Sequence, residues 1–323
     1  MADLSTPSNP LSTAVLFLIF NRPDTTAKVF EEIRRAKPPR LYVAADGARD
    51  GREGENDRVE SARSIATAID WPCEIKTLFR DKNLGCKRAV GEAITWFFEH
   101  EEQGIILEDD CLPHADFFRF TEVVLDRYRD DERVSVVTGD NFQDGKYRGS
   151  ASYYFSKYNH CWGWASWRRA WRHYQGDIPF WPEWSQSADW CEKMPDPVER
   201  RYWAKIFERV HAGGIDTWDY PWTASLWFQG GLTATPNVNL VSNIGFGPDS
   251  THTRAQKNPL AAIPIAPIGE IIHPAGVERC ADADKYLFDY SHGGRSLSFP
   301  YTILSFPRRI IRFLRRLLGK KIA

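Results

Sequence analysis

The first 138 residues alternate between short apolar runs and amphipathic stretches. The run AVLFLIF at 14–20 is continuous and has the length of a strand buried on both faces. Further strands are predicted at 41–47, 74–79, 104–110 and 134–138. The stretches between them predict helices at 27–35, 62–69, 87–98 and 117–128. This alternation predicts an α/β fold with a mostly parallel sheet flanked by helices and ligands at the carboxyl ends of the strands.

The pattern changes after Gly139. The chain becomes aromatic and irregular to about residue 230, regains alternating Val, Leu and Thr over 231–247, and is rich in Pro, Ala and Gly over 256–300. We therefore predict three parts: an α/β domain over 1–255 with halves at 13–140 and 141–255, a surface-wrapping extension at 256–306, and a tail at 307–323. The tail is expected to form a C-terminal amphipathic helix.

Polar side chains follow three of the predicted strands. Arg22 follows the first, Asp46 ends the second, and Glu108, Asp109 and Asp110 end the strand GIILEDD. Because parallel strands end at one edge of a sheet, we expect these residues to converge there. Three adjacent carboxylates repel one another, and a Mg²⁺ or Mn²⁺ ion that bridges to phosphate would relieve that repulsion. The alternative is a solvated acidic turn that caps the next helix.

The aromatic stretch is dense in tryptophan. Two interpretations stand side by side: a Trp-rich core layer, and a carbohydrate cleft in which indole faces stack on sugars. Both can hold for different members of the group. Eleven of the 13 Trp residues belong to it, namely Trp162, Trp164, Trp167, Trp171, Trp181, Trp184, Trp190, Trp203, Trp218, Trp222 and Trp227.

The net charge of −1 hides an asymmetry. The tail from Pro307 to Ala323 holds seven basic residues and no acidic one, so the rest of the chain is acidic, near −8. An acidic body argues against nucleic acid as a partner. The tail places Ile310, Phe313, Leu314 and Leu317 on one helical face among arginines. That pattern is typical of helices that lie on anionic membranes, although docking on the acidic body is the alternative.

The chain gives no signal for secretion or for a structural zinc site. Its start, MADLSTPSNP, lacks a basic and an apolar region, and none of the six Cys residues form a CxxC pair. We expect reduced thiols and a cytoplasmic location, with peripheral contact on the inner face of the cytoplasmic membrane through the tail.

In order along the chain, several short motifs resemble those of GT-A fold glycosyltransferases that use nucleotide sugars, most of all the N-acetylglucosaminyltransferase I type. The apolar strand followed by LEDDC resembles the acidic metal-binding motif of that family. The other segments are IFNRP, AADG, LGCKRAVGEAI, CWGWASW, TWDYPW (217–222) and NIGFGPDSTHT (243–253). The likeness covers roughly residues 14–253, and the order of the motifs makes it specific.

The resemblance implies a role for each matched residue. Asp110 would ligate Mn²⁺ or Mg²⁺, Asp109 would contact the ribose or metal-bound water, and Glu108 the transferred sugar. Arg22 would meet the phosphate or nucleoside and Asp46 the base, which favours UDP. It also assigns 13–140 to the nucleotide sugar and 141–255 to the acceptor.

The resemblance also places the catalytic base and a closing loop. Asp219 would be the general base of an inverting transfer to a glycan or lipid-linked glycan. The family has two acids where this chain has Asp219-Tyr220, and Asp216 lies three residues earlier, so Asp216 is the alternative base. His252 would lie near the diphosphate, or else be an ordinary loop histidine.

Two other functions remain as alternatives. One is a nucleotidyltransferase that makes an activated sugar, although Asn21-Arg22-Pro23 is not the Gly-rich first loop of that class. The other is a noncatalytic carbohydrate-binding protein, which would need neither a metal nor Asp110. The absence of GxxxxGK[ST] and GxGxxG motifs argues against P-loop and dinucleotide sites.

Overall fold

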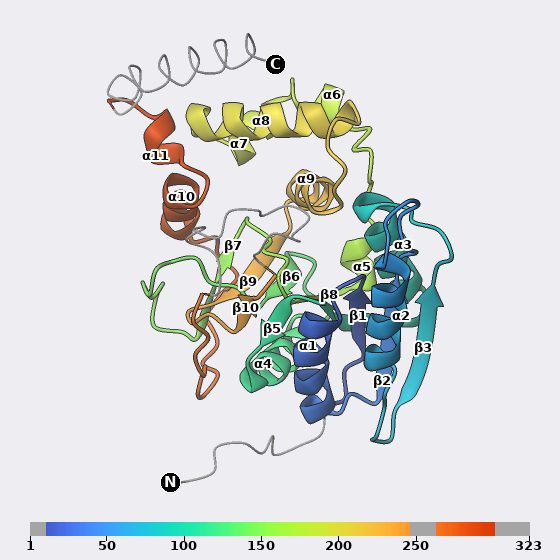
Figure 1. Ribbon diagram of the computed structural model, residues 1–323. Helices are drawn as coiled ribbons and strands as arrows, with labels where there is room; N and C mark the ends of the chain where they lie inside the picture. The colour runs from blue at the N-terminus through green and yellow to red at the C-terminus, as the bar shows by residue number, and fades with distance from the viewer. Residues whose placement is uncertain (1–10, 246–262, 301–323) are drawn as a thin grey trace.

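The computed structural model describes residues 11–245 and 263–300. Its centre is an eight-stranded sheet in the order β3-β2-β1-β4-β8-β6-β9-β7 (Figure 1). The first four of these strands are parallel: β1 (Val15–Ile19), β2 (Arg40–Ala45), β3 (Glu74–Phe79) and β4 (Gln103–Glu108). The α/β class and the parallel sheet predicted from the hydrophobic pattern are thereby confirmed.

The second half of the domain adds the remaining strands to the same sheet. They are β6 (Val134–Thr138), β7 (Tyr153–Ser156), β8 (Trp164–Trp167) and β9 (Leu232–Pro236). β8 runs antiparallel to both β4 and β6, so β6 points in the same direction as β4. The carboxyl ends of β1, β2, β4 and β6 therefore share one edge with the amino end of β8.

Helices cover both faces of the sheet. The first 138 residues supply α1 (Pro23–Ala36), α2 (Glu55–Ala66), α3 (Cys86–His100) and α4 (Ala115–Arg127). α1, α2 and α4 pack on one face with Val15, Phe17 and Ile19 of β1, whereas α3 packs on the other with Leu16 and Leu18. This placement explains why the first strand is apolar without a break, since successive side chains enter opposite cores.

The aromatic stretch forms a helical layer over the α3 face (Figure 1). Its helices are α5 (Arg168–Trp171), α6 (Trp181–Trp184), α7 (Ala188–Lys193), α8 (Pro197–His211) and α9 (Asp219–Gln229). Of the eleven clustered tryptophans, ten are buried and only Trp162 is partly exposed. Ten of these tryptophans therefore belong to the core, and of the eleven only Trp162 has exposed surface that a ligand could contact.

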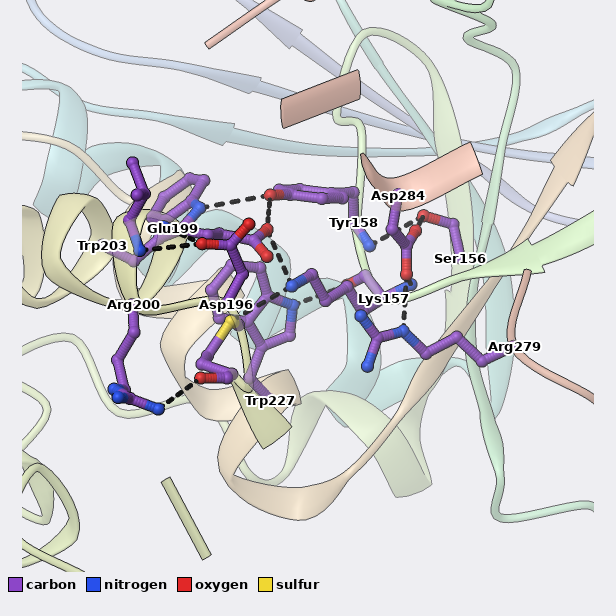
Figure 2. Close-up of polar contacts among 12 residues, drawn as sticks. Ser156, Lys157, Tyr158, Asp196, Glu199, Arg200, Trp203, Trp227, Arg279 and Asp284 are labelled. Atoms are coloured by element: carbon purple, nitrogen blue, oxygen red, sulfur yellow. Dashed lines mark hydrogen bonds and ion pairs between the residues drawn. The ribbon is translucent and has the colours of Figure 1, made fainter. Parts of the chain in front are cut away.

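The aromatic layer is tied to the sheet by a buried polar network (Figure 2). Lys157, just after β7, places Nζ 2.7 Å from Glu199 Oε1 of α8, and Glu199 also accepts the Tyr158 hydroxyl. Asp284 of α10 accepts from Ser156 Oγ at 2.5 Å and from Arg279 Nε at 2.5 Å. Burial lowers the pKa of Lys157, and the neighbouring Glu199 opposes that shift.

The segment 263–300 contains two helices that the hydrophobic pattern did not predict, α10 (Ala281–Tyr290) and α11 (Gly294–Leu297). Ala283, Leu287 and Phe288 of α10 are buried, the last two in the aromatic core. Within the described residues, no helix combines the length and the apolar character needed to cross a bilayer. The tail at 307–323 lies outside the described residues, so its helix and its membrane contact stay predictions.

Candidate functional site

Two of the three carboxylates after β4 meet Arg22, as predicted from their places at strand ends. Arg22 NH1 lies 2.7 Å from Asp110 Oδ2 and 3.3 Å from Asp109 Oδ1. Asp109 Oδ2 also accepts from the backbone N–H of Phe20 at 3.0 Å. The ends of β1 and β4 are thus joined through charged side chains, because their strands are neighbours in the sheet.

The acidic turn carries more negative charge than Arg22 can balance. Burial raises the pKa of Glu108 well above its usual value, and repulsion from Asp110, Asp109 and Asp219 adds to the shift. Burial and then Asp110 raise the pKa of Asp109, with Arg22 opposing both. Asp109 is buried and Glu108 and Asp110 are only partly exposed, so the turn is partly desolvated.

The chemistry of this donor set fits a hard divalent cation. Carboxylate oxygens are the ligands that Mg²⁺ and Mn²⁺ prefer, and a cation would offset the repulsion among Glu108, Asp109 and Asp110. Among the described residues, no three carboxylate, imidazole or thiol side chains are placed to hold a metal by themselves. Mg²⁺ sites in proteins often use one or two carboxylates and complete their shell with substrate phosphates and water.

Asp46 lies at the same edge, but its oxygens serve the backbone. They accept from the N–H groups of Leu84 at 3.0 Å, of Gly85 at 3.1 Å and of Gly47 at 3.0 Å. These bonds tie the end of β2 to the start of α3. The predicted contact of Asp46 with a base would use the acceptor capacity that these bonds leave.

Asp219 and Asp216 approach the acidic turn from the aromatic layer. Asp219 begins α9, and its charge contributes to the raised pKa of Glu108. Its Oδ1 accepts from the N–H of Tyr220 at 2.8 Å and from the Thr217 hydroxyl, whereas among the described residues Oδ2 accepts no hydrogen bond. Asp216 instead accepts from the N–H of Lys87 at 3.3 Å.

A small second sheet supports Asp110. β5 (Cys111–Pro113) pairs antiparallel with β10 (Val241–Asn243), so Asn243 lies opposite Cys111. The carbonyl of Asp110 accepts from the N–H of Ile244 at 2.8 Å, and Gly245 follows. The segment that resembles a closing loop, 243–253, therefore begins against the proposed metal ligand.

Gly245 is a sensitive position, because any side chain there would meet Asp110. A Cβ atom would overlap the Asp110 carboxylate and lie 2.7 Å from its Cβ. We expect Gly245→Ala to lower activity at least tenfold by displacing Asp110, with the unfolding midpoint nearly unchanged, since the contact is local. Gly276→Ala is a matched control, since Gly276 is exposed and a Cβ atom there meets only Glu278 Oε1, at 3.9 Å. Full activity in Gly245→Ala would contradict this placement of Asp110.

Asp140 is a residue of this edge that the sequence analysis missed. It follows β6, is fully buried, and accepts from the N–H of Trp162 through Oδ2 at 3.0 Å. Its Oδ1 has no hydrogen-bond partner among the described residues, and burial raises its pKa well above the usual value. The strand-end rule that selected Asp46 also applies to Asp140 in VSVVTGD, so the signal was present.

The position of His252 and the ligand roles of the other predicted site residues are not tested by the structure. His252 lies in 246–262, outside the described residues. The specific ligand roles of Arg22, Asp46, Glu108, Asp109, Asp110 and Asp219 stay predictions, although the structure brings these residues to one edge.

Comparisons with known proteins add little to this geometry. No protein-family model matches the chain, and no curated protein sequence matches it. Among solved structures the chain is similar to UDP-glucose pyrophosphorylase complexed with UDP-glucose, at 12% identity and a TM-score of 0.26. The similarity covers 45% of this chain and 62% of that one, less than two thirds of its length. A likeness this distant assigns neither a family nor an activity.

Proposed function

We propose that this protein is a metal-dependent glycosyltransferase that moves a sugar from a nucleoside-diphosphate sugar, with UDP favoured, to a glycan or lipid-linked glycan. The observation that carries the proposal is the meeting of Arg22 with Asp109 and Asp110 at the carboxyl edge of the sheet, beside Glu108, which lies within electrostatic range of Asp219. This edge offers candidate partners for an anionic diphosphate and for a cation, and a candidate acceptor for the proton of the attacking hydroxyl.

Each residue at the edge has a place in the proposal. Asp110 would hold the cation, Arg22 would turn from Asp110 toward the diphosphate, and Glu108 and Asp109 would contact sugar and ribose. Bound Mn²⁺ or Mg²⁺ would neutralise charge that develops on the departing diphosphate. Arg22 is suited to its part because a guanidinium binds phosphate and carboxylate with the same planar fork.

The transfer itself is a single displacement. The bond between the anomeric carbon and the diphosphate oxygen breaks as an acceptor hydroxyl oxygen bonds to that carbon. The acceptor proton passes to Asp219, whose Oδ2 accepts no hydrogen bond among the described residues. Attack from the face opposite the diphosphate inverts the configuration of the sugar.

We expect Asp219→Asn to lower transfer about 100-fold or more, because an amide cannot take the proton. UDP affinity should stay within about threefold, since the side chain keeps its size and its contact with Tyr220 N–H. Rates of transfer and calorimetric titration with UDP and Mn²⁺ measure the two effects. Asp216→Asn is the matched control and should keep most activity. Equal losses of transfer and UDP binding in Asp219→Asn would contradict the role of a base.

The products separate this proposal from its alternatives. A glycosyltransferase incubated with UDP-glucose or UDP-N-acetylglucosamine and Mn²⁺ releases UDP, whereas a nucleotidyltransferase given the same sugar nucleotide and pyrophosphate forms UTP. A noncatalytic carbohydrate-binding protein does neither. Release of UDP that requires Mn²⁺ supports the proposal, and formation of UTP would replace it with the nucleotidyltransferase.

The proposal extends to location. A lipid-linked acceptor on the cytoplasmic leaflet would explain a basic amphipathic tail at 307–323, which would hold the enzyme on an anionic membrane. This part rests on sequence alone.

A further inference from the structure

A groove runs along the outer side of α3 and begins next to the candidate site. It has a volume of about 590 Å³ and lies between α3, which contributes Gly91 and Trp96, and the segment that carries Tyr174 and Gly176. Gly91 allows Tyr174 to approach the helix, because a Cβ atom there would lie 3.1 Å from the Tyr174 hydroxyl oxygen.

A second hollow lies next to the first, farther along α3. This hollow has a volume of about 270 Å³, shares Thr95 and Glu99 with the first, and ends at Arg168 and Arg172. From Lys87 to Glu99 the helix rises about 18 Å at 1.5 Å per residue. The groove is therefore long and open, which suits a chain molecule better than a compact ligand.

One end of the groove meets the carboxylates of the aromatic layer. Lys87, at the start of α3, lines the groove, and its backbone N–H lies 3.3 Å from Asp216 Oδ1. Asp216 lies three residues before Asp219, the proposed base. A chain in the groove would thus point its leading end toward Asp219.

The lining favours a ligand rich in hydroxyl groups. Trp96 and Tyr174 are partly exposed aromatic rings, and indole and phenol faces pack against the C–H faces of sugar rings. The two cations of the first hollow are already paired: Lys87 Nζ lies 2.6 Å from Asp177 and Arg88 Nε 2.7 Å from Glu92. Glu99 adds a third carboxylate, so the first hollow has no unpaired cation to attract a phosphate and offers carboxylate oxygens to hydroxyl donors.

We propose that this groove binds the oligosaccharide part of the acceptor, with the sugar that receives the transferred unit at the Lys87 end. The inference rests on the proposed function, since it names the acceptor class of that site. A lipid chain would cover the Glu99 carboxylate with apolar atoms, whereas a nucleic acid would meet the excess negative charge of the first hollow, where three carboxylates outnumber two cations.

The test uses the full-length protein and an array of neutral and acidic oligosaccharides of one to eight residues, without donor. We expect wild-type protein to retain oligosaccharides of three or more residues, and Glu99→Arg to lower their affinity at least tenfold. Glu208→Arg, on an exposed position of α8, is the matched control and should bind as wild type does. Trp96→Ala is a second variant. Its unfolding midpoint is measured to show that it folds, because the ring centroids of Trp96 and Tyr42 lie 5.2 Å apart and the substitution removes this packing.

Two outcomes would overturn the groove as the acceptor site. One is that the array retains no oligosaccharide, and the other is that Glu99→Arg and folded Trp96→Ala bind as wild type does. Release of UDP from UDP-glucose or UDP-N-acetylglucosamine with Mn²⁺ but no acceptor is followed in parallel. This release should be equal in wild type and Glu208→Arg. If the wild-type protein releases no UDP, the proposed function is refuted. If it releases UDP but binds no oligosaccharide, only the assignment of the groove as the acceptor site is refuted.

Discussion

Replacing Asp110 by Asn is expected to lower glycosyl transfer by about three orders of magnitude. The amide has the shape of the carboxylate but no charge, so it would hold a divalent cation poorly and leave the departing diphosphate unbalanced. In Asp110→Asn the amide oxygen can still accept the hydrogen bond from Arg22, which the wild-type carboxylate accepts at 2.7 Å. The fold should therefore be retained, and the unfolding midpoint should change little.

The measurement is the initial rate of UDP release over a range of Mn²⁺ concentrations. Wild-type protein should show saturation with Mn²⁺, and Asp110→Asn should show a small rate that Mn²⁺ does not raise. Asp57→Asn is the matched control, because Asp57 is an exposed carboxylate in the first turn of α2. An Asp110→Asn rate within threefold of wild type would remove Asp110 from the site.

Replacing Glu199 by Ala is expected to destabilise the protein by about 3–5 kcal/mol, the usual cost of leaving one member of a buried ion pair alone. Lys157 would lose the carboxylate that now lies 2.7 Å from its Nζ, and the Tyr158 hydroxyl would lose its acceptor. Burial already lowers the pKa of Lys157, and the loss of the Glu199 carboxylate would lower that pKa further and favour the neutral amine. Urea denaturation at pH 7 measures the change in unfolding free energy.

The double variant Lys157→Met/Glu199→Leu separates the charge pair from the packing around it. Removing both charges should cost less than removing Glu199 alone, because no unpaired charge is left in the aromatic layer. Glu208→Ala, on the exposed side of the same helix, should change stability by less than about 0.5 kcal/mol. A Glu199→Ala loss no larger than that of Glu208→Ala would mean that the network in Figure 2 does not hold the layer.

The hydrophobic pattern predicted most elements of the first half of the fold within a few residues, although the helix predicted at 62–69 is α2 at Glu55–Ala66, whose first turns are charged. The strand predicted at 14–20 is β1 at Val15–Ile19, and the helix predicted at 87–98 is α3 at Cys86–His100. These elements were readable because each carries its own apolar pattern, continuous in the strand and periodic in the helix. The placement of Arg22, Asp46 and Asp110 at one edge followed from strand direction alone.

The second half was harder to predict, since its strands β7 and β8 have only four residues each. β8 reads WASW and lies between β4 and β6, and nothing in four residues of that composition distinguishes a central strand from a loop. α10 was missed because its buried Leu287 and Phe288 complete an aromatic core built from 164–227. Asp140 was not predicted because it is a single acidic residue after VSVVTG, without the adjacent carboxylates that mark the turn after β4, although it too follows a parallel strand.

The central claim is that the edge formed by Arg22, Asp109 and Asp110 binds a nucleoside diphosphate with a divalent cation. Calorimetric titration of the wild-type protein with UDP, once with Mn²⁺ and once with EDTA, tests it most directly. The account predicts saturable binding with Mn²⁺ that weakens at least tenfold in EDTA and is likewise weakened in Asp110→Asn. Equal UDP affinity under both conditions, or no binding of UDP, GDP or CMP with Mn²⁺, would contradict it.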